Sequence, residues 1–156
     1  MATFKIETPE RISSMQGFFY DTPHQLDAIQ PGMTIQKVGR TTGLTRGIVV
    51  GQYDNPVPIK YTSPNFSGHV YFSDFYVVRG LEAAFSLPGD SGSLVVNEDG
   101  SAAVGLVFAG AEANLSYVIP IEDIVSAIGL EIVSGHNVSP HGGHDERQDQ
   151  NIDQGT

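Results

Sequence analysis

Short apolar runs alternate with turn-forming residues along the middle of the chain. The runs are rich in β-branched and aromatic residues, and glycine, proline, asparagine or aspartate separates them. This pattern predicts a succession of short β-strands rather than long helices. The predicted strands cover residues 34–38, 45–53, 57–61, 70–78, 82–86, 92–96, 103–109 and 117–119.

One segment near the C-terminal end has the spacing of a helix instead. Residues 121–128 place apolar side chains at helical spacing, with acidic residues in the first turn. Pro120 stands where it can open the helix, and Gly129 stands where it can end it. Strands, tight turns and one late helix favour an all-β domain over residues 32–133. We expect a single antiparallel barrel of about six strands with a short C-terminal helix.

The two ends of the chain lack this pattern. Residues 1–31 are interrupted by prolines and are typical of a connecting arm laid over a surface. Residues 134–156 contain few large apolar side chains, so we expect a disordered polar tail. The tail holds His136, His141 and His144 beside acidic residues, which could ligate a metal. Nothing there would fix the geometry of such a site, so we favour a solvated tail, with no metal and no cofactor.

Composition narrows the choice of partners and compartment. The formal net charge of -10 argues against nucleic-acid binding, which needs clustered lysine and arginine. The sequence has no cysteine, which is compatible with a reducing compartment. The N-terminus, residues 1–7, has no apolar stretch of signal-peptide length, and no window approaches the roughly 20 apolar residues needed to span a bilayer. We therefore expect a cytoplasmic protein with no membrane partner, unless a segment upstream of this chain carries its own signal.

The most informative segment for chemistry is the turn at residues 88–93. Attack on an amide carbonyl needs a nucleophile on a tight turn whose backbone N–H groups face the developing oxyanion. Gly89 and Gly92 bracket Asp90 and Ser91, which allows a sharp turn and a close approach of substrate backbone. The same tetrapeptide also occurs as an ordinary turn. The strand directly after it, and a second glycine-flanked strand beyond, favour the functional interpretation.

With this turn, the chain resembles the chymotrypsin-like serine peptidases, and most of all their small bacterial branch of the alpha-lytic-protease type. One motif is Gly-Asp-Ser-Gly-Ser at residues 89–93. The other is Val-Gly-Arg-Thr-Thr-Gly at residues 38–43, followed by Gly-Ile-Val at residues 47–49. The similarity covers residues 32–133 and implies the C-terminal barrel of a chymotrypsin-like double barrel. Residues 1–31 resemble the linker between the two barrels.

The resemblance implies roles for the residues around the turn. Ser91 would be the nucleophile of a trypsin-like serine peptidase, and the N–H groups of Gly89 and Ser91 would form its oxyanion hole. Asp90 would be buried, where an unpaired carboxylate is costly. Arg40 would be its bidentate partner and would hold the turn in shape without cleavage of a precursor. The alternative for Arg40 is an ordinary surface arginine of a hairpin.

The resemblance also implies a substrate-binding surface beside the nucleophile. Phe85 and Ser86 would line the pocket for the substrate side chain next to the scissile bond. Phe85 at the base of this pocket would disfavour a basic side chain. Ala109 and Gly110 would lie on the strand that pairs with the backbone of an extended peptide.

The general base that such a peptidase needs has no clear candidate in the chain. In the family, the histidine and aspartate lie earlier in the sequence, on an N-terminal barrel. Only His24 and His69 precede Ser91, and neither has the small-residue, strand-end context of the family's histidine. The sequence does not distinguish among four aspartates that could orient the histidine: Asp21, Asp27, Asp54 and Asp74. The catalytic triad is therefore incomplete in this chain.

Two hypotheses for function follow. The first is a serine endopeptidase lobe that carries the nucleophile and the oxyanion hole and acts on a peptide or protein substrate. It would be inactive or weakly active alone, until an N-terminal barrel from the parent chain or another subunit supplied the base. The second is an inactive half-barrel that binds extended peptides or a protein partner through its inter-barrel face. That face would be apolar and would favour a homodimer.

Overall fold

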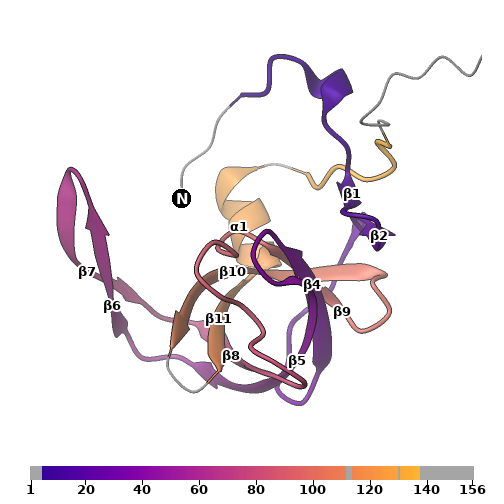
Figure 1. The fold of residues 1–156 in the computed structure, drawn as a ribbon. Helices are drawn as coiled ribbons and strands as arrows, with labels where there is room; N and C mark the ends of the chain where they lie inside the picture. The colour runs from indigo at the N-terminus through magenta and orange to yellow at the C-terminus, as the bar shows by residue number, and fades with distance from the viewer. Residues whose placement is uncertain (1–4, 112–113, 130, 138–156) are drawn as a thin grey trace, which may run out of the picture.

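The computed structural model describes residues 5–111, 114–129 and 131–137. The barrel strands are β4 (Thr34–Gly39), β5 (Gly43–Tyr53), β8 (Phe75–Gly80), β9 (Leu94–Asn97), β10 (Ala102–Ala111) and β11 (Leu115–Pro120). They form a closed, six-stranded antiparallel barrel in the order β4-β5-β8-β11-β10-β9, and β9 pairs back onto β4 (Figure 1). The predicted all-β fold is confirmed.

Branched apolar side chains fill the interior of the barrel. Fully or almost fully buried members of this core include Ile35 on β4, Val49 on β5, Val78 on β8, Val95 on β9 and Val118 on β11. Burial of each such side chain stabilises the fold by about 1.5–3 kcal/mol relative to exposure. The core therefore holds the strands around the candidate site in a fixed frame.

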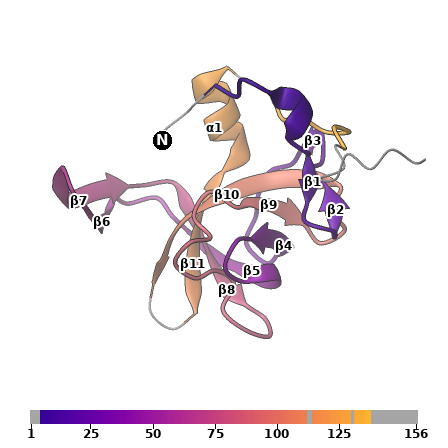
Figure 2. The ribbon, with the colours of Figure 1, turned by 45° about the horizontal axis from the view of Figure 1, so that its top comes forward.

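Helix α1 (Ile121–Ile128) packs against β10 and β11 at one end of the barrel (Figure 2). Gly129 ends the helix in the left-handed conformation, with φ of 64°. Both predicted bounds are confirmed, because the proline before the helix and the glycine after it are local signals. None of the helices in the described part of the chain has the length and apolar character needed to cross a membrane.

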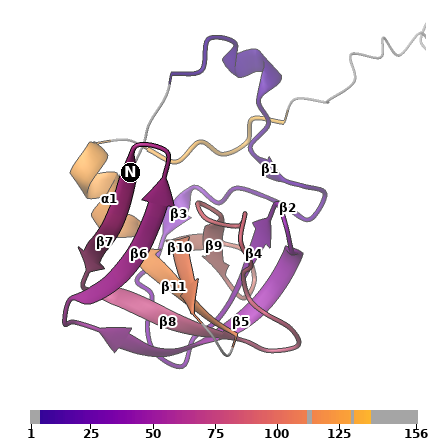
Figure 3. The same ribbon diagram turned by 60° about the vertical axis from the view of Figure 1, so that its left-hand side comes forward.

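A hairpin of two strands projects from the barrel between β5 and β8. Strands β6 (Val57–Ser63) and β7 (Phe66–Phe72) pair with each other (Figure 3) and extend away from the barrel (Figure 1). The predicted single strand over residues 70–78 is wrong, because the chain turns at Asp74, which has φ of 57°. Aspartate tolerates this left-handed conformation, and here it separates the hairpin from β8.

The predicted strand over residues 82–86 is also wrong. These residues form a series of bends that leads into the candidate site. The hydroxyl of Thr45 donates to the carbonyl of Phe85 at 2.7 Å. A side-chain donor thus satisfies a carbonyl that a strand would have paired with a neighbouring backbone N–H.

The end of the N-terminal arm pairs with the barrel, while its residues 5–12 are exposed. Over its described residues, 5–31, the arm contains the 3₁₀ turn η1 (Pro9–Arg11) and the two-residue strands β1 (Met15–Gln16), β2 (Tyr20–Asp21) and β3 (Gln25–Leu26). Strand β3 pairs in parallel with the start of β10. The arm is therefore joined to the barrel by backbone hydrogen bonds.

The segment after α1 returns to this arm. The N–H of Ser14 donates to the carbonyl of His136 at 2.7 Å, and the N–H of His136 donates to the Ser14 hydroxyl at 2.8 Å. The first residues of the predicted tail thus pack against the arm. Residues 138–156 lie outside the described residues, as does the possible metal site that includes His141 and His144.

Candidate active site

Two successive turns precede β9 and present Ser91 to solvent. In the first, the N–H of Asp90 donates to the carbonyl three residues earlier at 3.0 Å, and Gly89 has φ of 105°. In the second, the carbonyl of Asp90 accepts from the N–H three residues later at 3.0 Å, and Gly92 has φ of 88°. A positive φ at the third position is typical of a type II turn. Ser91 lies between the two glycines and is exposed.

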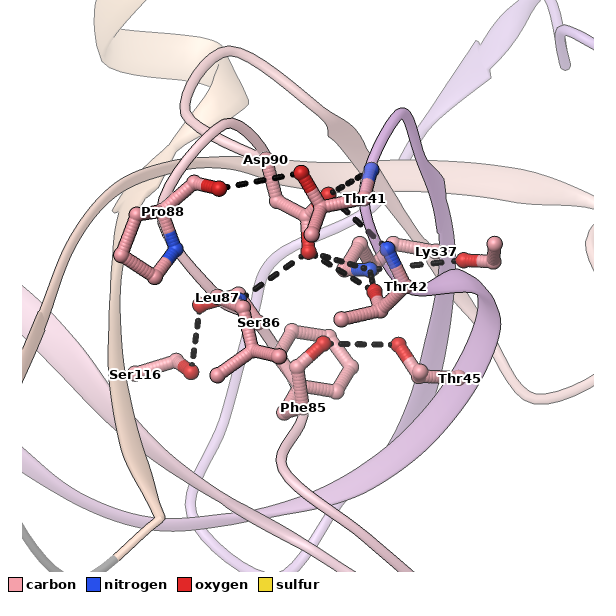
Figure 4. Close-up of polar contacts among 11 residues, drawn as sticks. Lys37, Thr41, Thr42, Thr45, Phe85, Ser86, Leu87, Pro88, Asp90 and Ser116 are labelled. Atoms are coloured by element: carbon pink, nitrogen blue, oxygen red, sulfur yellow. Dashed lines mark hydrogen bonds and ion pairs between the residues drawn. The ribbon is translucent and has the colours of Figure 1, made fainter.

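The carboxylate of Asp90 holds these turns against the hairpin of β4 and β5 (Figure 4). Oδ1 accepts from the backbone N–H groups of Thr41 at 2.7 Å and Thr42 at 3.3 Å. Oδ2 accepts from the hydroxyl of Thr42 at 2.7 Å and the N–H of Leu87 at 3.0 Å. Asp90 is only 1% exposed. Burial opposes its ionisation, but the hydrogen bonds and the charge of Lys37 outweigh burial and hold the pKa of Asp90 well below its usual range.

Lys37 on β4, rather than Arg40, supplies the cation for Asp90. The Nζ of Lys37 lies 3.4 Å from Oδ2 of Asp90, and both side chains are fully buried. Nζ also donates to the hydroxyl of Thr42 and lies 5.7 Å from the centre of the Phe85 ring. Burial lowers the pKa of Lys37, while the charge of Asp90 acts in the opposite direction. The predicted pairing of Arg40 with Asp90 is wrong.

The positions of the two cations along the hairpin explain this difference. Lys37 is in phase with the buried Ile35, so the strand directs both side chains inward. Arg40 follows the end of β4, and its side chain is exposed. Its guanidinium lies beside the turn, since a methyl group built on Gly89 would lie 3.1 Å from Nη2 of Arg40. A lysine in phase with an inward-facing isoleucine is the sequence signal for the buried cation.

A pocket of about 360 Å³ opens beside the exposed serine. Its described lining consists of Ser86, Leu87, Pro88, Ser91, Val107, Ala109, Gly110 and Ala111. The hydroxyl oxygens of Ser86 and Ser116 lie 2.7 Å apart (Figure 4). The structure thus brings Ser91 together with three residues that the sequence assigned to substrate binding: Ser86, Ala109 and Gly110.

Phe85 does not take the position predicted for it. Its side chain is fully buried in the hydrophobic core and is absent from the described lining of the pocket. Ser86, the next residue, does line the pocket. Successive side chains of an extended segment point to opposite sides, so a pocket-facing Ser86 sends Phe85 into the core.

Strand β10 offers an edge beside the same pocket. Its last pair with β9 joins Leu106 to Leu94, and just beyond that pair the N–H of Gly92 donates to the carbonyl of Val107 at 2.7 Å. On its other side, β10 pairs with β11 through a register shift between Val107 and Ala109. Within the described residues, the end of β10 beyond this shift therefore pairs on one side only, which is the arrangement that β-augmentation needs.

The amides that would face an oxyanion have no acceptor in the described ranges of the chain. Neither the N–H of Gly89 nor that of Ser91 donates to a residue there, and the hydroxyl of Ser91 has no partner among those residues either. His24 and His69 are exposed, and no described histidine is hydrogen-bonded to Ser91. None of the four aspartates considered as orienting carboxylates forms a hydrogen bond or an ion pair with a histidine among the described residues.

A metal site is not evident in this part of the molecule. No group of three histidine, cysteine, aspartate or glutamate side chains comes together within residues 5–111, 114–129 and 131–137. The ring of His136 instead lies 2.9 Å from the carbonyl of Pro9.

The family comparison covers the barrel and the candidate site. The family model of the Nal1 C-terminal domain matches residues 21–129. The chain belongs to the Nal1 C-terminal domain family. The matched range ends at Gly129, the residue that ends α1, and it includes Lys37, Asp90 and Ser91. No curated protein matches this member of the Nal1 C-terminal domain family in sequence.

Solved structures of bacterial proteases share the fold of this Nal1 C-terminal domain. Protease A of Thermobifida fusca has a TM-score of 0.57 at 20% identity, covering 77% of this chain and 59% of the protease. Chymotrypsin of Cellulomonas bogoriensis has a TM-score of 0.55 at 21% identity, covering 79% and 61%. Nocardiopsis protease has a TM-score of 0.54 at 18% identity, covering 78% and 58%.

These similarities establish the fold of the Nal1 C-terminal domain as a barrel that bacterial serine proteases also contain. The predicted resemblance to chymotrypsin-like peptidases is therefore confirmed at the level of the fold. The chain spans about three fifths of the length of each of the three proteases.

Proposed function

We propose that this chain is the nucleophile-bearing lobe of a serine endopeptidase. One arrangement carries the proposal: an exposed serine stands at the edge of a pocket, on a turn whose two amides have no acceptor among the described residues. A substrate carbonyl placed there would accept from the N–H groups of Gly89 and Ser91 as its oxygen gains negative charge. The edge of β10 would hold the substrate backbone next to Ser91.

The chemistry would follow the two steps of acyl transfer. Ser91 Oγ forms a bond to the carbonyl carbon of the substrate while its proton passes to a base. The C–N bond then breaks, the amine leaves with a proton, and the acyl group stays on Ser91 as an ester. Water hydrolyses the ester and returns the serine hydroxyl.

The buried contacts of Asp90 support a turn that is already formed in the intact chain. Its carboxylate accepts from Lys37, from Leu87 and from the tip of the β4–β5 hairpin, all within one domain. No new N-terminus is needed to neutralise the buried charge. The oxyanion site would therefore be available without cleavage of a precursor.

The base and its orienting carboxylate would come from a second lobe. This proposal is supported by the absence of a hydrogen bond between Ser91 and a histidine in the described part of the chain, and by the length of the proteases that share its fold. A serine without a base is a weak nucleophile, although an oxyanion hole alone retains part of the rate. We expect low activity from this chain alone and full activity when a second lobe, of the parent chain or another subunit, is present.

Labelling with a fluorophosphonate tests whether Ser91 is activated. The serine oxygen forms a bond to phosphorus, fluoride leaves, and a base takes the proton. We expect label on Ser91 at a rate on the order of a hundredfold above that of the exposed Ser63, because the two amides stabilise the charged transition state. Added imidazole should increase the rate further by acting as the missing base.

Two serine variants give the control. Ser91→Ala should abolish the label, and Ser63→Ala should leave it unchanged. Label that persists in Ser91→Ala, or reacts no faster at Ser91 than at Ser63, would remove Ser91 from the mechanism. If an extended peptide still perturbed the amides of Ala109 and Gly110 in that case, an inactive peptide-binding half-barrel would be the better account.

A further inference from the structure

The described lining of the pocket beside Ser91 combines apolar residues with the hydroxyl-bearing Ser86. Leu87 and Pro88 contribute from the segment before the turn, and Val107 and Ala109 contribute from β10. Ser86 is the polar member other than Ser91 itself. A side chain with an apolar stem and a polar end would therefore match the pocket.

The hydroxyl pair of Ser86 and Ser116 has a preferred direction of donation. Ser116 is 1% exposed, and the oxygen of Ser86 is the partner that its hydroxyl has among the described residues. If Ser116 donates to Ser86, its hydrogen is satisfied and the hydrogen of Ser86 is left for the pocket. The reverse direction would leave the hydrogen of Ser116 buried and unpaired, which is costly. Ser86 therefore offers the pocket a donor.

The described lining of the pocket holds no residue that could neutralise a charged substrate side chain. That lining contains no lysine, arginine, histidine, aspartate or glutamate. The buried charges of Lys37 and Asp90 are already paired with each other. Among the described lining residues, an acidic or basic side chain would lose water without gaining a partner of opposite charge, which disfavours its entry.

We infer that this pocket selects a neutral side chain that ends in a hydrogen-bond acceptor, of the glutamine class. The side chain belongs to the residue whose carbonyl Ser91 attacks, so the inference rests on the proposed function. Its methylene groups lie against the apolar walls, and its amide oxygen accepts from the hydroxyl of Ser86. Glutamate brings an unpaired charge, and leucine leaves the Ser86 donor without an acceptor.

Peptidyl phosphonate esters that differ in a single side chain test this selectivity. The side chains are glutamine, glutamate, leucine and lysine, and the rate of adduct formation on Ser91 is measured by mass spectrometry on the full chain with added imidazole. We expect the glutamine probe to react roughly five- to tenfold faster than the leucine probe, the value of one hydrogen bond. It should react on the order of a hundredfold faster than the glutamate and lysine probes.

Serine variants identify the donor. Ser86→Ala should remove the faster reaction of the glutamine probe relative to the leucine probe. Ser116→Ala should keep that lead, because Ser86 can still donate into the pocket, and the exposed Ser63→Ala is the matched control. A lead of glutamine that survives Ser86→Ala, or a glutamate or lysine probe as fast as the glutamine probe, would overturn the inference.

A binding measurement separates this inference from the proposed function. N-acetylated tripeptides ending in glutamine, leucine or glutamate are titrated against the unlabelled chain, and the amides of Ala109 and Gly110 are followed by NMR. The glutamine peptide should bind several-fold more tightly than the other two, with or without an activated serine. Failure of all phosphonate labelling would reject the peptidase, whereas labelling of Ser91 without this order of affinities would reject the pocket assignment alone.

Discussion

Lys37 and Asp90 form a fully buried ion pair, with Nζ and Oδ2 3.4 Å apart, although they are 53 positions apart in the sequence. The pair joins a core strand of the barrel to the turn that presents Ser91. Two buried charges are tolerated because each is also hydrogen-bonded, Asp90 to the hairpin backbone and Lys37 to the hydroxyl of Thr42. The stability of the barrel and the shape of the candidate site therefore depend on one contact.

Removal of the cation should destabilise the protein. Lys37→Met leaves Asp90 buried without a counter-ion, and we expect the free energy of unfolding to fall by about 3–5 kcal/mol. Urea denaturation measures this change. Arg40→Gln, at the exposed cation of the same hairpin, should change it by less than about 0.5 kcal/mol. A larger loss from Arg40→Gln than from Lys37→Met would contradict the assignment of the buried cation.

Acid should weaken the fold through Asp90. The pKa of Asp90 is lower in the folded than in the unfolded state, so its contribution is complete above the unfolded value of about 3.9 and is lost as the pH falls below it. The free energy of unfolding, measured by urea between pH 6 and 2.5, should decline towards low pH. Asp90→Asn should decline less steeply. The pKa values of Asp21 and Asp99 are also lowered, and these two residues contribute equally to the pH dependence of the unmodified protein and of Asp90→Asn. If the free energy of unfolding declined equally steeply in both proteins, Asp90 would not be the cause.

The two glycines of the turn should differ in their tolerance of a side chain. Gly89 and Gly92 both have positive φ, so alanine at either position costs about 1–2 kcal/mol in backbone strain. A Cβ on Gly89 would also overlap the hydroxyl of Thr41, whereas a Cβ on Gly92 would meet nothing within 4 Å. Gly89→Ala should therefore reduce the free energy of unfolding by at least about 1 kcal/mol more than Gly92→Ala. Equal losses in urea denaturation would show that the overlap is relieved.

The contact between the two ends of the chain should be separable from the barrel. Ser14 donates its hydroxyl proton to Asp21 at 2.5 Å and accepts from the N–H of His136 at 2.8 Å. Ser14→Ala removes both hydrogen bonds, and we expect a loss of about 1–3 kcal/mol in the stability of this contact. Hydrogen exchange should accelerate at the amide of His136 but not at the barrel amide of Val107. Acceleration at both amides would mean that the arm and the barrel open together.

The parts of the fold that the sequence predicts best are those with local signals. Pro120 and Gly129 define α1, and the β-branched runs locate the barrel strands. The strand expected over residues 70–78 is divided because Asp74 adopts a left-handed φ. The apolar residues on both sides of Asp74 give no sign of this turn in the sequence. The expected strand at residues 82–86 gives way to bends that depend on Thr45, which is distant in sequence.

The sequence indicates the turn that holds Ser91, but it does not identify Lys37 and Ser116, which contact residues of the candidate site. The motif around Ser91 locates the turn, and the position of Asp90 beneath it follows from the same motif. The motif does not identify the cation that pairs with Asp90, because an arginine at the hairpin turn is a more conspicuous partner than a lysine inside a strand. The phase of Lys37 with Ile35 contains the information. The hydroxyl of Ser116 approaches Ser86 through tertiary pairing that no local pattern encodes.

The amides of residues 89 and 91 are proposed to form a site for negative charge beside Ser91. The most direct test is a crystal structure of the chain with a phosphonate bonded to Ser91. We predict a phosphonyl oxygen about 2.7–3.1 Å from both the N of Gly89 and the N of Ser91, with Asp90 still in contact with Lys37. An adduct whose oxygens all face solvent, or a turn whose two amides point apart, would contradict the account.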